Sequence, residues 1–193
     1  MKKALAGVLA VALAGVMAGS AIAQVPNVQV YFDPAFTETQ AFCPPAGPPV
    51  NTSLHVVMNN WNMNITGVDF SIQYPPALIW LGDALVDPLT QVSLGNSPTG
   101  IAIAYANCCA QDGFQPVEVL RPFVQWGVCD PTCNQPAQAV VVGGYAPLGK
   151  TQPSAIRKED FAEFSGIGMT SLVCPGIVAT QPSTWGQVKA LYR

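Results

Sequence analysis

The sequence contains six cysteines, the side chains with the clearest chemistry: Cys43, Cys108, Cys109, Cys129, Cys133 and Cys174. An even number of cysteines in an exported chain predicts a framework of about three disulfides. Neighbouring side chains on a strand point to opposite faces, so Cys108 and Cys109 are expected to bond different partners. Cys43 and Cys174 are far apart in sequence and form one natural pair. Cys129 and Cys133 are close enough to bridge around a turn.

The same thiols could instead bind a metal ion. The segment CDPTC has three residues between Cys129 and Cys133, and Cys108 with Cys109 could complete four thiolate ligands. The chain has no C-x2-C pair, however, and the cysteines of exported proteins normally oxidise. The missing C-x-x-C motif also disfavours a redox enzyme. We therefore expect disulfides, with no metal and no other cofactor.

Other side chains that could carry out catalysis are scattered. His55 is the only histidine, and no nucleophile or acid near it in sequence completes a triad. Asp83 and Asp87 could face each other as the carboxyl pair of a glycosidase. Calcium could be bound by these two acids with Asp112 or Asp130, although no EF-hand pattern is present. Solvated loop acids are the simpler interpretation, and we predict that the chain is not an enzyme.

A tryptophan in an asparagine-rich segment is the best candidate for binding a ligand. Trp61 lies in MNNWNMN, between Asn59, Asn60 and Asn62. An exposed aromatic ring can stack on a sugar, and amide side chains add adaptable hydrogen bonds. This pattern supports a carbohydrate-binding module as an alternative function. The competing interpretation, which we favour, is that the aromatic rings fill the core.

The first 23 residues have the form of a Sec signal peptide. Two lysines precede an apolar run, and Ala21-Ile22-Ala23 forms a cleavage site. Cleavage after Ala23 removes 23 of 193 residues, leaves 170, and changes the formal charge from −3 to −5 through loss of two lysines. We therefore predict a protein that is secreted, periplasmic or in the cell envelope, with no later membrane span. The mild negative charge argues against nucleic-acid partners.

The remaining chain predicts an all-β fold. Short runs of alternating apolar residues recur between Pro, Gly and Asn, and no βαβ rhythm is visible. We predict a two-sheet Ig-like or jelly-roll sandwich of about eight or nine strands over residues 24–182. The expected strands span residues 28–33, 53–59, 67–74, 77–81, 90–94, 100–106, 116–126, 138–143 and 170–174.

Two segments interrupt this pattern and predict one or two short helices near the C-terminus. The charged segment RKEDFAEF (157–164) places Phe161 and Phe164 three residues apart, as on one face of a helix. The tail at 183–193 places apolar residues at the same spacing after a possible serine or threonine cap. It could be a docking or sorting tail that exposes Trp185, Lys189, Tyr192 and Arg193.

The succession SLHVVMNN, ITGVDFSIQYPPALIWL and GIAIAYA, within residues 50–106, resembles the cohesin-like branch of bacterial Ig-like sandwiches. The whole chain is also similar to small exported bacterial proteins that begin with a strand such as VQVYFDP and end in a TWGQVKALYR-type tail. The first resemblance implies a jelly-roll sandwich that recognises proteins or carbohydrates. No binding residue carries over, because the matched segments form the core.

These observations together predict an exported, non-catalytic binding or structural module with a protein or glycan partner. Recognition would use loops at one end of the sandwich or strand addition at a sheet edge. The low charge of the chain makes strand addition physically reasonable, because charged residues normally protect sheet edges.

Overall fold

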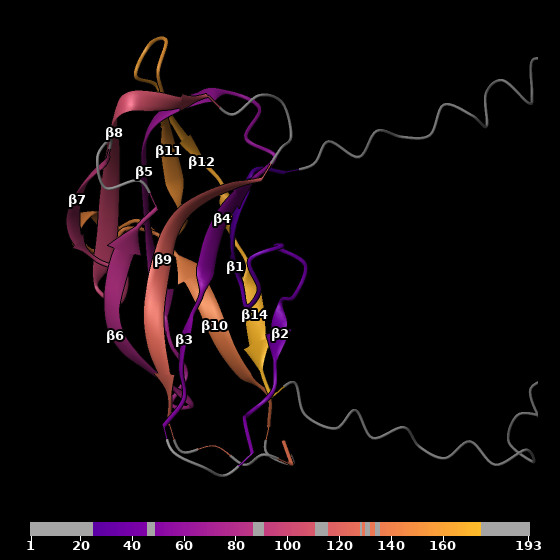
Figure 1. Cartoon of the computed structure of the whole chain (residues 1–193). Coiled ribbons are helices and arrows are strands. Elements are labelled where there is room, and N and C mark those ends of the chain that lie inside the picture. The colour runs from indigo at the N-terminus through magenta and orange to yellow at the C-terminus, as the bar shows by residue number, and fades with distance from the viewer. Residues whose placement is uncertain are drawn as a thin grey trace, which may run out of the picture.

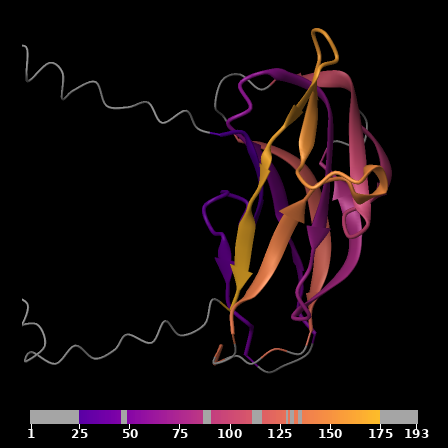
Figure 2. The same cartoon turned by 180° about the vertical axis from the view of Figure 1, so that it is seen from behind.

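Strands make up almost all the regular structure and lie in two sheets packed face to face (Figures 1 and 2). The computed structural model describes residues 25–45, 49–86, 91–110, 116–127, 129, 132–133 and 136–174. The predicted signal peptide (1–23) and the C-terminal tail (183–193) lie outside these residues. The helices of the described part include none that is long and apolar enough to cross a membrane.

The first sheet has six strands, with β9 at its centre. β9 pairs with β3 and β4, and also with β6, while β1 joins β4 to β13 at the margin. The strands are β1 (Asn27–Tyr31), β3 (Asn51–Ser53), β4 (His55–Asn59), β6 (Leu78–Leu85), β9 (Val117–Trp126) and β13 (Ile167–Gly168).

The second sheet has eight strands, with β5 at its centre. On one side β5 pairs with β8, and β8 pairs in turn with β7. On its other side β5 pairs with β11 along its first part and with β10 along its last part. The strands are β2 (Gln40–Ala41), β5 (Asn64–Gln73), β7 (Gln91–Asn96), β8 (Gly100–Ala110), β10 (Gln138–Gly143), β11 (Ser154–Arg157), β12 (Glu163–Ser165) and β14 (Thr170–Val173). A single turn of 3-10 helix, η1 (Ala146–Leu148), follows β10.

The core lies between the sheets and is built from alternate residues of the predicted strands. On β5, Phe70 and Ile72 are fully buried, and on β4 Val56 and Met58 face them from the other sheet. Burial of side chains of this size contributes about 1.5–3 kcal/mol each. Side chains from both sheets meet in one core, which confirms the predicted two-sheet sandwich.

The expected details differ in two respects. The described residues form 14 strands rather than eight or nine, because several short edge pairings escape the alternation pattern. The helix predicted at 157–164 is wrong: this segment ends β11, turns, and returns as β12 in a hairpin. Ion pairing between Arg157 and Asp160, three residues apart, occurs in that turn instead of on a helix face.

Candidate functional site

An apolar groove of about 400 Å³ lies on the outer face of the eight-stranded sheet. Its walls carry three large side chains that are unusually open to solvent: Val92 is 68% exposed, Leu94 70% and Phe161 73%. Single exposed apolar residues are ordinary on a protein surface, but several around one hollow indicate an interaction site. The groove is lined by Thr66, Gly67, Val68, Asp69, Val92, Ser93, Leu94, Ala102, Ile103, Ala104, Ile156 and Phe161.

The register of four neighbouring strands explains the shape of the groove. One cross-strand row runs from Val92 through Ala104 and Gly67 to Ile156. Ala104 and Gly67 in the middle are small, so the larger side chains of Val92 and Ile156 project above them at the two ends of the row. A side chain at Gly67 would lie 3.4 Å from Cδ1 of Ile156 and would raise the floor. Small residues on the two central strands thus leave a furrow between β7 and β11.

Phe161 closes the groove from the β11–β12 turn. Its φ of 56° lies in the left-handed region, which is rare for a bulky side chain. Asp160 fixes the turn by accepting hydrogen bonds from Arg157 Nε at 2.8 Å and from the backbone N–H of Ala162 at 3.1 Å. A turn selected for stability alone would carry Gly or Asn at such a position. An exposed phenylalanine in a strained conformation therefore points to a role at the surface.

A charged cluster borders the groove at Asp69. Lys150 Nζ lies 2.5 Å from carboxylate oxygens of both Asp69 and Glu163, and it donates to Ser154 Oγ at 2.9 Å. Ser154 in turn donates to Asp69 at 2.9 Å. Burial alone would lower the pKa of Lys150, but its hydrogen bonds to the two carboxylates outweigh this effect and raise it. Lys150 and Asp69 are therefore paired with each other within the cluster, and Glu163 shares the same ammonium group.

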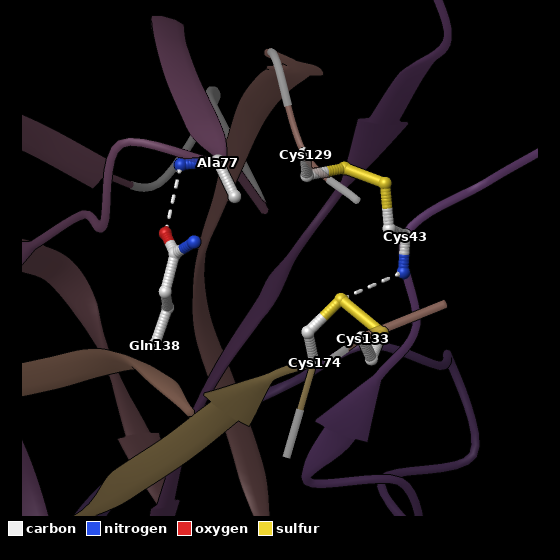
Figure 3. Close-up of a disulfide and its surroundings, with 6 residues drawn as sticks. All are labelled: Cys43, Ala77, Cys129, Cys133, Gln138 and Cys174. Carbon is white, nitrogen blue, oxygen red and sulfur yellow. Dashed lines mark hydrogen bonds between the residues drawn. A yellow bond between two sulfur atoms is a disulfide. The ribbon is translucent and has the colours of Figure 1, made fainter. Parts of the chain in front are cut away.

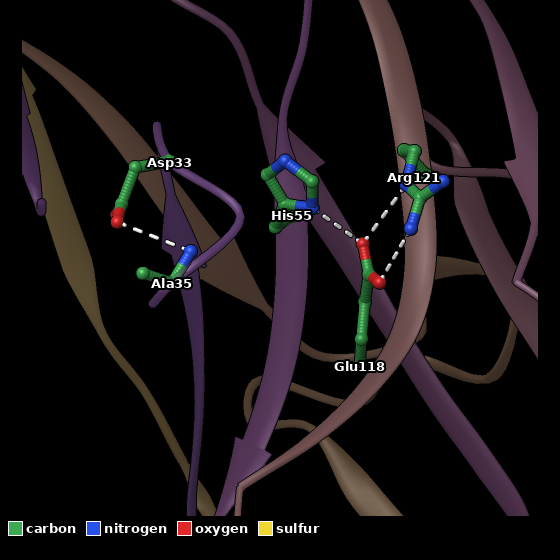
Figure 4. A network of polar contacts seen from close by, with 5 residues as sticks. All are labelled: Asp33, Ala35, His55, Glu118 and Arg121. Atoms are coloured by element: carbon green, nitrogen blue, oxygen red, sulfur yellow. Dashed lines mark hydrogen bonds and ion pairs between the residues drawn. The ribbon is translucent and has the colours of Figure 1, made fainter. Parts of the chain in front are cut away.

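The single histidine belongs to a second polar network on the other sheet (Figure 4). His55 Nδ1 lies 2.6 Å from Oε1 of Glu118, and Arg121 donates to both oxygens of the same carboxylate. The ring of Phe36 lies 6.0 Å from the imidazole, on a loop held by the carboxylate of Asp33. The network joins β4 to β9 through the carboxylate of Glu118.

This network predicts how stability depends on pH. Burial alone would raise the pKa of Glu118, but hydrogen bonds with Arg121 and His55 outweigh it and hold the pKa below its usual 4.5. The carboxylate thus stabilises the fold fully above pH 4.5, and this contribution is lost as pH falls through the lowered pKa. We expect Glu118→Gln to flatten the acid side of a plot of Tm against pH. Arg121→Met should also shrink this acid decline, because the folded-state pKa of Glu118 returns toward its unfolded value, and unchanged profiles in both variants would contradict the assignment.

Four of the cysteines lie together beside the ends of β2 and β14, and they pair differently from the expectation (Figure 3). Cys43 bonds Cys129, and Cys133 bonds Cys174, so both predicted pairs are wrong. The two bridges are adjacent, because the backbone N–H of Cys43 donates to Sγ of Cys174 at 3.4 Å. The loop carrying Cys129 and Cys133 is thereby tied to the ends of β2 and β14. Such bridges are typical of proteins from oxidising compartments.

Cys108 and Cys109 lie on β8, outside the residues whose side chains are described. Their predicted pairing with different partners stays a prediction. Among the described residues, no group of three or more His, Cys, Asp or Glu side chains is placed to hold a metal ion.

Trp61 proves to be a core residue. Its side chain is buried, and the indole N–H donates to the backbone oxygen of Asn27 at 3.0 Å. Asn59 donates to the side chain of Asn27, while Asn60 and Asn62 both adopt positive φ in the turn after β4. A buried ring cannot stack on a sugar, so the carbohydrate-binding alternative loses its central residue.

The acidic pair considered for glycosidase or calcium chemistry is not assembled in the described part. Asp83 accepts hydrogen bonds from Trp80 Nε1 at 3.1 Å and from both the backbone N–H and hydroxyl of Ser97 at 2.7 Å. It thereby ties β6 to the β7–β8 hairpin. Asp87, Asp112 and Asp130 lie outside the described residues, as do Trp185, Lys189, Tyr192 and Arg193 of the tail.

The groove residues were not predicted as a site. The pattern QVSL marked a strand at 90–94, but it did not reveal that Val92 and Leu94 face solvent. Phe161 was expected on a helix. The small residues in GIAIAYA and ITG form the floor of the groove. The sequence shows that they are small, but only the register between the strands shows that they lie side by side.

Comparison with known proteins finds no matching family model and no matching curated protein. Among solved structures, a cohesin module of a Clostridium perfringens family 33 glycoside hydrolase is 10% identical, with a TM-score of 0.49 over 77% of this chain and 95% of that chain. The sixth cohesin of Acetivibrio cellulolyticus scaffoldin B, solved with a Cel5 dockerin, is 8% identical, with a TM-score of 0.47 over 78% and 98%.

The third ScaB cohesin of R. flavefaciens, solved with a group 1 dockerin, is 14% identical, with a TM-score of 0.46 over 78% of this chain and 95% of that chain. At these identities and TM-scores the likeness is one of strand arrangement.

Proposed function

We propose that this chain is an exported, non-catalytic module that binds a polypeptide in the groove between β7 and β11. The observation that carries the proposal is the grouping of Val92, Leu94 and Phe161, each about two-thirds exposed or more, around one hollow. Burial of such side chains against a partner contributes favourable free energy in proportion to the apolar area removed from water.

The chemistry of the groove favours a protein partner over a sugar. Its lining is almost entirely apolar, and the nearest charges, on Lys150 and Asp69, already satisfy each other. A sugar needs several hydrogen-bonding groups that converge on it, whereas the cores of protein interfaces are apolar and rich in aromatic residues. We infer that the partner inserts bulky apolar side chains between Val92 and Ile156, beneath Phe161.

Site-specific photocrosslinking in the producing cell tests this proposal. A benzophenone phenylalanine at Phe161 is expected to capture a discrete polypeptide, and mapping of the crosslinked peptide should show apolar residues at the contact. The matched control replaces Phe123, which is 45% exposed on the outer face of the other sheet. Equal capture at both positions, or none at Phe161, would refute the proposed surface.

Two substitutions separate binding from folding. Ala104→Asp places a charge on the exposed groove floor and should abolish capture at Phe161, because the incoming apolar side chain would have to desolvate that charge. Phe161→Asn removes the aromatic ring but suits a left-handed turn position. With the photocrosslinker moved to Leu94 in the same groove, we expect this variant to lose the partner while its Tm stays equal to or above that of the wild type. Retention of the partner by both variants would contradict the proposal.

The docking or sorting role of the tail remains a separate proposal. The described residues end at Cys174, and the support for it is the pattern of Trp185, Lys189, Tyr192 and Arg193 in the sequence.

A further inference from the structure

The outer edge of β7 is the least protected sheet edge in the described part of the molecule. β7 pairs with β8 alone, and Figure 1 shows it at the outer margin of the eight-stranded sheet. Its six residues, QVSLGN, include no charge and no proline, and its pairing with β8 continues without a bulge. Natural sheets usually protect such edges with charges, prolines, bulges or short strands.

The other margins show these protections. β12, at the opposite end of the same sheet, has three residues, and Glu163 on it is held by Lys150. β2 and β13 have two residues each. β6 is longer, but it carries Asp83 and a bulge between Trp80 and Gly82. Only the β7 margin combines length, regular pairing and absence of charge among the described edges.

We infer that two copies of this chain associate through β7, as antiparallel neighbours about a two-fold axis that passes beside Ser93. Main-chain N–H and C=O groups on the open side of β7 would then pair with the same groups of the second copy. The two eight-stranded sheets would become one continuous sheet. Because β7 carries no charge, its close approach to an identical strand meets no like-charge repulsion.

The side chains of β7 are complementary to themselves in this register. With Ser93 opposite Ser93 of the second copy, Val92 lies opposite Leu94 of the second copy, and Leu94 lies opposite Val92. All four side chains stand on the outer face, since residues two apart on a strand share a face. Cross-strand pairs of apolar side chains stabilise a sheet, and this pairing would cover the two most exposed residues of the strand.

This inference goes beyond the proposed function and does not depend on it. The far wall of each groove, formed by Ile156 and Phe161, lies three strands away from the paired edges. The second copy would contact Val92 and Leu94 of the near wall and leave the far wall outside the paired strands.

A charge-swap series on the mature, disulfide-bonded chain tests both the association and its register. Light scattering with size exclusion should show the wild type as a dimer at tens of micromolar. Val92→Lys with Leu94→Lys should place lysines opposite each other and weaken the dimer at least about tenfold. Val92→Lys with Leu94→Glu should restore it, because each lysine then meets a glutamate of the second copy. Matching Tm values among the variants would confirm that folding is intact.

A cysteine at the two-fold axis gives an independent readout. Directly opposed residues in an antiparallel pair lie about 4.5–5.5 Å apart between Cα atoms, which suits a disulfide. Ser93→Cys is expected to yield a covalent dimer on non-reducing gels, with peptide mapping to identify the bond. Ser165→Cys, the matched change on the protected edge of β12, should remain monomeric on the gel. A monomeric wild type, a dimer unaffected by paired lysines, or equal crosslinking at both cysteines would overturn the inference.

Discussion

Phe70→Ala is expected to lower the free energy of unfolding by about 3–5 kcal/mol, the largest effect of a single side chain in this fold. Phe70 is fully buried at the middle of β5, the strand that joins β8 to β10 and β11. Truncation removes apolar area from the core and leaves a cavity that the surrounding strands can fill only partly, because backbone hydrogen bonds fix β5 on both sides.

Urea denaturation at neutral pH, with the disulfides intact, would measure this effect. Phe42→Ala is the matched control, since Phe42 is 66% exposed. A substitution at such a position usually changes stability by less than about 0.5 kcal/mol. A loss below about 1 kcal/mol for Phe70→Ala would show that β5 does not lie at the centre of the core.

The alternation of apolar and polar residues in β5 correctly predicted burial on one face of the strand but not on the other. In the strand predicted at 67–74, the apolar residues of the alternation are Val68, Phe70 and Ile72, and all three are buried. Asp69 and Ser71, on the opposite face, are also buried. Asp69 is covered because Lys150 and Ser154 approach it from more than eighty residues away in sequence. A contact of that range leaves no periodic signal, so the polar face of the strand looked solvated from the sequence.

The segment at 157–164 shows why local spacing can mislead. Arg157 and Asp160 are three residues apart, a separation that brings side chains together in a helix and also in a tight turn. The pairing with β5 decides between a helix and a turn, because β11 forms an antiparallel pair with residues 65–69 of β5. Pairing of β11 then draws the chain into a hairpin, and Phe161 moves from a predicted buried helix face to the exposed rim of the groove.

The residue types also could not show which apolar side chains are buried in the core and which line the groove. Trp61 looked available for a ligand because it stands among asparagines, yet its ring packs against Gly166, where a side chain would lie only 2.6 Å from the indole. Leu94 looked like part of an ordinary strand, yet it is 70% exposed. Which apolar residues stay uncovered depends on the face of the sheet that each one occupies: Trp61 belongs to the core, whereas Leu94 lines the groove on the outer face.

Removal of the Cys43–Cys129 bridge by paired Cys→Ser substitutions is expected to cost about 2–5 kcal/mol of stability. The bridge spans 86 residues, and its loss greatly increases the conformational freedom of the unfolded chain. Removal of Cys133–Cys174, which spans 41 residues, should cost about 0.7 kcal/mol less on the loop-entropy model. Chemical denaturation of the two variants, each with the other bridge verified by peptide mapping, would test the order.

Removal of the Cys43–Cys129 bridge should also affect some parts of the folded protein more than others, because the segment that Cys43 anchors has few other contacts. β2 pairs with β14 over only two residues, and Cys43 follows it directly. Without its bridge, the β2 segment keeps this short parallel pairing and a few hydrogen bonds beside it, and hydrogen exchange at Gln40 and Ala41 should accelerate while β5 stays protected. Acceleration throughout the sandwich would instead show that the bridge supports the core itself. Unchanged exchange at β2 would mean that this edge is held by packing, and that the cysteines act on the unfolded chain alone.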